Sequence, residues 1–143
     1  MSQRPQPDNP ATHASTKAPP LSLTELFERC MGNAAIATLV LDKFEKQLTR
    51  DVLDIEERLV ARDAGQIART AHALKGSAGA AAATALQSLA ATVEGLARQD
   101  QLDSIAHELA ALRAEVDRCV GYLPTARAAL KGGTCGPVAE TER

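Results

Sequence analysis

The chain has 143 residues, a length that fits one domain, and 45% of them are apolar, which is enough to form a core. With 16 basic and 18 acidic residues the net charge is −2, so the basic surplus of a nucleic-acid-binding protein is lacking and no nucleic-acid partner is expected. Aromatic residues make up only 2% while alanine and leucine are abundant, which favours an all-α protein.

The two ends of the chain differ from its middle. Residues 1–20 hold five of the seven prolines among polar residues, a composition that predicts a disordered leader. Ser22-Leu23-Thr24-Glu25 has the S-x-x-E form of a capping box and predicts a short helix from Ser22 to about Gly32. Glycines and a proline gather after Lys131 and predict a flexible tail over 131–143. The folded part is therefore expected over 21–130.

Four longer helices are predicted over 33–62, 64–79, 83–99 and 101–123, because apolar residues recur there at spacings of three and four. Asp63 is the expected N-cap of the second, and Pro124 is expected to break or kink the last. One-sided helices joined by short loops predict an antiparallel four-helix bundle, with the short N-terminal helix capping one end. The stripe predicted on the first long helix consists of Ile36, Leu39, Val40, Phe44, Leu48, Val52, Ile55 and Leu59.

The helix predicted over 64–79 places one histidine outside the core. At about 100° per residue its core stripe lies on one side, and His72 lies roughly 130° away, facing solvent. The core stripe consists of Ile67, Ala71, Leu74 and Ala78, and the neighbours of His72 are Ala68, Arg69, Lys75, Gly76 and Gly79.

The neighbours of His72 favour phosphoryl chemistry. A neutral imidazole is a nucleophile toward an activated phosphoryl group, and Lys75 would offset the charge of the product. Gly76, one turn after His72, costs about 1 kcal/mol relative to alanine in mid-helix. Access for a partner's active site is one reason for a glycine there, and close helix packing, at Gly76 and Gly79 alike, is the other. Each residue alone is typical of an ordinary helix surface, whereas the combination favours a functional site.

The segment His72-Ala73-Leu74-Lys75-Gly76-Ser77-Ala78 resembles the H-x-L-K-G-S-[SA] signature of histidine-containing phosphotransfer (HPt) domains. Ala71, Leu86 and Glu94 are also placed as in that family, and the resemblance covers about 21–125. The chain departs from the family at 80–83, where four alanines replace the frequent bulky apolar residue and Gly-Ala. The boundary between the second and third long helices is therefore open.

The resemblance implies that His72 accepts a phosphoryl group from a receiver-domain aspartate and passes it to another receiver, with Lys75 stabilising the phosphoryl charge. Gly76, Ala68, Arg69 and Gly79 would belong to the surface on which the receiver docks, together with parts of the helix over 33–62. Such a protein is a phosphoryl carrier and not an enzyme. Its partner, a receiver domain of a response regulator or hybrid sensor kinase, supplies the transfer chemistry, and one exposed histidine per chain suits a monomer.

Other signals are weaker. His107-Glu108-Leu109 resembles the H-E-L of sensor-kinase dimerisation helices but lacks the Arg-x-Pro that follows there, so no role is expected for His107. The odd number and wide spacing of Cys30, Cys119 and Cys135 indicate neither a disulfide framework nor a metal site, and no cofactor is expected.

The chain also contains no apolar run of membrane-spanning length and no secretory signal, which favours a cytoplasmic protein without a membrane partner. A helical adaptor that binds a receiver or sensor kinase without carrying phosphate remains the alternative.

Overall fold

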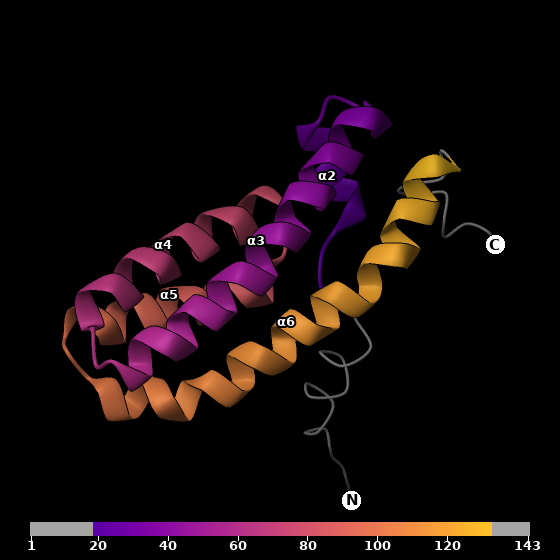
Figure 1. Cartoon of the computed structure of the whole chain (residues 1–143). Helices are drawn as coiled ribbons and strands as arrows, with labels where there is room; N and C mark the ends of the chain where they lie inside the picture. Colours follow the sequence, from indigo (N-terminus) through magenta and orange to yellow (C-terminus); the bar gives the residue numbers. More distant parts are fainter. Residues whose placement is uncertain (1–18, 133–143) are drawn as a thin grey trace, which may run out of the picture.

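Five helices make up the part of the chain that the structure, a computed structural model, describes, residues 19–132. The short helix α2 (Leu23–Arg29) precedes four long helices: α3 (Ala34–Val60), α4 (Ala64–Ala80), α5 (Thr84–Arg98) and α6 (Leu102–Lys131). Successive long helices run antiparallel; α4 packs against α3 and α5, and α6 packs against the same two (Figure 1). The predicted all-α antiparallel bundle with a short N-terminal helix is confirmed, whereas the predicted leader and tail lie largely outside the described residues.

Side-chain caps set the starts of three helices. Ser22 Oγ accepts a hydrogen bond from the amide of Glu25, and Asn33 Oδ1 accepts one from the amide of Ile36. Asp63 caps α4 in the same way, as its sequence position predicts. Each cap satisfies an amide that has no partner within its helix, so these residues fix where the helices begin.

The last three of the four alanines, residues 81–83, form a tight, buried turn between α4 and α5. α4 ends at Ala80, one residue past the predicted end. Ala82 has a φ of 61°, in the left-handed region that residues other than glycine rarely adopt. The carbonyl of Ala82 accepts a hydrogen bond of 3.0 Å from the amide of Ser22. The departure from the family pattern therefore leaves the helix boundary almost unchanged and joins the start of α2 to this turn.

The stripe predicted on α3 is wrong at its N-terminal end. Ile36 and Leu39 are 45% and 66% exposed, whereas Ala37 and Leu41 are fully buried. Both sets satisfy a spacing of three and four, and the set with Ala37 is the one that faces the neighbouring helices. These two apolar side chains consequently lie on the surface of α3, as do Leu53 and Val60 further along the helix.

Of the two outcomes predicted for Pro124, a break in the last helix is wrong, because α6 continues through Pro124 for two further turns. Proline removes one helical hydrogen bond, and packing against α3 offsets that loss. Leu130 is 1% exposed, and Arg127 forms ion pairs with Asp42 at 3.0 Å and Glu45 at 2.5 Å. None of the described helices is both long enough and apolar enough to cross a membrane.

Candidate functional site

α4 presents His72 to solvent because the opposite face of the helix is buried. Ile67, Ala71, Leu74 and Ala78 are all fully buried, while the His72 side chain is 64% exposed. The orientation predicted from the helical wheel is confirmed. Burial of the core stripe fixes the rotation of α4, and this rotation places the imidazole outside the bundle.

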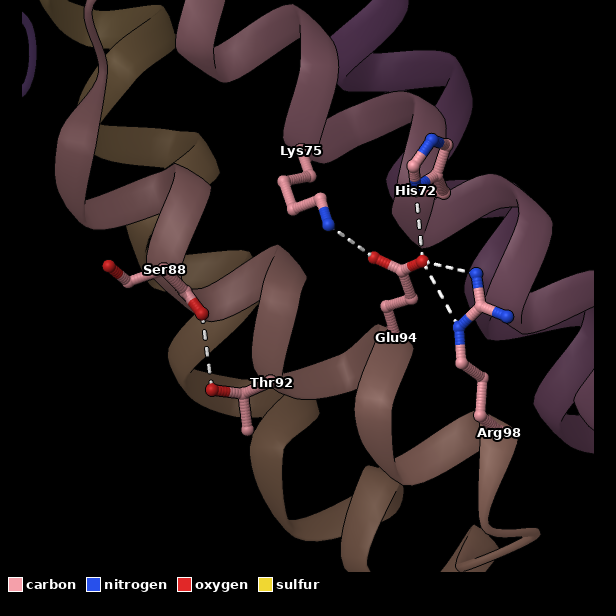
Figure 2. Close-up of polar contacts among 6 residues, drawn as sticks. All are labelled: His72, Lys75, Ser88, Thr92, Glu94 and Arg98. Carbon is pink, nitrogen blue, oxygen red and sulfur yellow. Dashed lines mark hydrogen bonds and ion pairs between the residues drawn. The ribbon is translucent and has the colours of Figure 1, made fainter.

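A buried carboxylate from α5 lies beneath the imidazole (Figure 2). His72 Nδ1 lies 3.0 Å from Glu94 Oε2, and Lys75 Nζ lies 2.8 Å from Glu94 Oε1. Arg98 Nη2 and Nε donate to Glu94 Oε2 at 2.6 and 3.2 Å. Glu94 is only 5% exposed, so its charge is held between α4 and α5 by these contacts.

The charge of Glu94 determines which nitrogen of His72 carries hydrogen. Hydrogen bonds from Lys75 and then from Arg98 lower the pKa of Glu94 to about 2, although burial alone would raise it. At neutral pH Glu94 is therefore a carboxylate, which accepts hydrogen bonds and donates none. The contact with His72 is a hydrogen bond only when Nδ1 carries the hydrogen, and this leaves a lone pair on Nε2. Nε2 lies on the side of the ring away from Glu94 (Figure 2).

One side of His72 opens onto a shallow depression between α4 and α5. Arg69 and Arg98 contribute guanidinium groups to its lining, and the remaining lining residues are small, apart from His72 itself. Ala68, which the sequence places on the candidate surface, is 9% exposed and contributes little more than the floor. The full lining consists of Gly65, Ala68, Arg69, His72, Ala97 and Arg98.

On the other side of α4, a groove runs between α3 and α4. Ser77 Oγ donates a hydrogen bond to Gln47 Oε1 of α3 within this groove, so Ser77 holds the two helices together. Gly76 forms part of the α4 wall, and the apolar residues come from both helices. The lining consists of Val40, Lys43, Phe44, Gln47, Gly76, Ser77 and Ala80. These α3 residues were not assigned to the site from sequence.

Gly76 and Gly79 have different surroundings. A β-carbon added at Gly76 would meet no atom within 4 Å, counted outside its own helical backbone and chain neighbours, whereas one at Gly79 would lie 2.8 Å from Gln87 Nε2. The Gly79 carbonyl also accepts a hydrogen bond from Arg29 of α2. A larger residue at Gly79 would thus have to displace the exposed end of the Gln87 side chain, whereas at Gly76 it would displace nothing.

Two residues of the site, Glu94 and Arg98, received no role from the sequence. The resemblance to the HPt family concerns only the position of Glu94 in the sequence. The available signal was an acid within the apolar pattern of α5, one residue after the fully buried Val93 and with Arg98 one turn later. Such an acid needs a partner, because a buried charge is stable only when it is paired.

The remaining candidate nucleophiles are poorly placed. Cys119 is fully buried, and burial raises the pKa of its thiol to about 12, so little thiolate forms at neutral pH. Cys30 is buried as well, and Cys135 lies outside the described residues. His107 is exposed on α6, on a different helix from His72.

Known proteins share both the sequence pattern and the fold. The chain matches the model of the Hpt domain over residues 39–121, a segment that includes His72, Lys75 and Glu94. Its fold is similar to the crystal structure of histidine-containing phosphotransfer protein B (HptB) from Pseudomonas aeruginosa PAO1, with a TM-score of 0.62 and 23% identity over 80% of this chain and 94% of that one. No curated protein matches significantly. Because the family match spans more than half of the sequence, this chain belongs to the Hpt domain family, whose members are histidine phosphotransfer modules of phosphorelays.

Proposed function

We propose that His72 Nε2 receives a phosphoryl group from the aspartyl phosphate of a receiver domain and passes it to an aspartate of another receiver. One observation carries this proposal: the imidazole is 64% exposed while its Nδ1 contacts a buried carboxylate. That arrangement supports a nucleophilic Nε2 at the surface, with the Lys75 ammonium one turn away.

The transfer step uses three side chains of this chain. The Nε2 lone pair attacks phosphorus, the N–P bond forms, and the bond from phosphorus to the aspartate oxygen breaks, so the carboxylate leaves with the electron pair. Nδ1–H continues to donate to Glu94, whose charge offsets the positive charge that develops on the ring. Lys75 stabilises the phosphoryl oxygens. Transfer to the next receiver reverses these bond changes, which fits a carrier.

The docking surface for the receiver is proposed to be the groove between α3 and α4 together with the depression beside His72. Ile36 and Leu39 are exposed on α3, as are Leu53 and Val60, so this helix offers apolar groups that a docked receiver would cover. Gly76 leaves the approach to His72 open. Ala68, Arg69 and Gly79 would border the contact on α4.

A labelling experiment tests the phosphoacceptor. The protein is incubated with a receiver domain carrying labelled aspartyl phosphate, and acid-labile, base-stable label on this chain is followed. His72→Gln is expected to abolish the label, while His107→Gln, which removes the other histidine of the described part of the chain, is expected to keep it. Label that survives His72→Gln would place the acceptor elsewhere. Receiver binding without any label on the unmodified protein would instead support the adaptor alternative.

A further inference from the structure

The single carboxylate of Glu94 contacts two cations and one imidazole. Oε1 accepts from Lys75, while Oε2 accepts from Arg98 and from His72. The carboxylate is buried, but the side chains of Arg98 and His72 are each 64% exposed and that of Lys75 is 34% exposed. Two permanent cations therefore lie at the surface above one buried anion.

Lys75 pairs with Glu94 in this arrangement, yet in the proposed function it also contacts the phosphoryl group. Its ammonium is 2.8 Å from Glu94 Oε1, and phosphoryl oxygens bound to Nε2, on the side of the His72 ring away from Glu94, would draw it away from that carboxylate. A buried carboxylate without a cation is strongly unfavourable. Arg98 occupies the other oxygen, Oε2, and does not have to move when Lys75 does.

We propose that Arg98 is a positioning residue for phosphoryl transfer: it keeps the charge of Glu94 paired, so that Lys75 can leave Glu94 and bind the phosphoryl group as His72 receives it. This inference rests on the proposed function of His72. Arg98 does not touch the reacting atoms in this account, since it acts through Glu94. Arg69 lines the same depression from α4, but the described residues that pair with Glu94 are His72, Lys75 and Arg98, so Arg69 is not part of the exchange.

An ordinary ion pair within a helix is the competing explanation, because Arg98 follows Glu94 by four residues. Such pairs contribute little on an exposed surface. Here the carboxylate is buried and Arg98 shares one oxygen with His72. α6 contains a comparable pair on a helix that does not carry His72: Arg118 contacts Glu115 at 2.9 Å, and Glu115 is 8% exposed. Arg118→Gln is therefore the control for losing an arginine from a buried glutamate.

The test is a double-mutant cycle on the full chain with phosphoramidate as the phosphoryl donor. Nε2 attacks phosphorus and ammonia leaves, so no receiver is needed, and phosphohistidine formation is followed by ³¹P NMR. Lys75→Gln and Arg98→Gln are each expected to slow the reaction about tenfold, and the double variant is expected to be little slower than either. Without Arg98, the Lys75 ammonium stays paired with Glu94. Replacing Lys75 in that background therefore changes the reaction rate little. Arg98→Lys should recover most of the rate, and Arg118→Gln should match the unmodified protein.

Independent effects, with the double variant slowed about a hundredfold, would overturn the proposal, as would an unchanged rate for Arg98→Gln. Circular dichroism of each variant checks that the helices are intact. Absence of phosphohistidine in the unmodified protein, with this donor and with a phosphorylated receiver, would refute the proposed function. A labelled protein whose variants behave additively would refute only the role of Arg98.

Discussion

At Gly76, two explanations for a glycine within a helix can be compared: close packing inside the chain, and access for a partner protein. It lies on an exposed part of α4, and an added β-carbon would meet nothing within 4 Å outside its own helical backbone and chain neighbours. Close packing within the chain therefore does not require it, and the cost of a glycine in mid-helix has no compensation inside the described structure. Access for the proposed receiver is the explanation that we infer.

Two substitutions at Gly76 are expected to separate stability from transfer. Gly76→Ala should raise the free energy of unfolding by about 1 kcal/mol, because alanine is the better helix former and the site has room. Gly76→Gln should keep the fold but slow phosphoryl transfer from a receiver, since its side chain projects beside His72. Urea unfolding and the labelling assay measure the two effects. A less stable Gly76→Ala, or unchanged transfer in Gly76→Gln, would contradict the steric interpretation.

At the scale of the helices, the stability of the interface between α4 and α5 depends on the ionisation of Glu94. The pKa of Glu94 is about 2 in the folded chain, below its ordinary value of 4.5, so its ion pairs stabilise the fold above about pH 4.5. That contribution decreases as the pH falls toward 2, because the unfolded chain binds the proton first.

The free energy of unfolding, measured by urea at several pH values between 6 and 2, should decrease more steeply for the unmodified protein than for Glu94→Gln. The glutamine variant has no carboxylate to protonate at this position. Glu108→Gln on α6 provides the control and should follow the unmodified protein. If the free energy of unfolding changed with pH in the same way for the unmodified protein and Glu94→Gln, the ion pairs of Glu94 would not stabilise the bundle.

The helices differ in how far their sequences predict them. α4 could be predicted closely because its apolar residues form one stripe only, which fixes the face that carries His72. α3 offers two overlapping stripes, and the choice between them depends on neighbouring helices that a single helical pattern does not contain. The continuation of α6 past Pro124 likewise depends on ion pairs between Arg127 and α3. The contact of His72 with Glu94 joins residues on different helices, so periodicity along either helix does not reveal it.

On the scale of the whole molecule, the bundle holds the proposed nucleophile, His72, at a fixed place on its surface. α3 and α5 flank α4 on its two sides (Figure 1), and they contribute the proposed docking groove and the buried carboxylate respectively. The helices thus supply position and charge, while the proposed receiver supplies the activated phosphoryl group. This division of roles fits a carrier that exchanges phosphate between partners.

Nitrogen–phosphorus coupling in the NMR spectrum of the phosphorylated protein, with its histidines labelled with ¹⁵N, tests this account most directly. After reaction with a phosphorylated receiver, coupling is expected at Nε2 of His72, with Nδ1 still carrying its hydrogen. Coupling at Nδ1 of His72, coupling at another histidine, or phosphate on a residue other than histidine would contradict it.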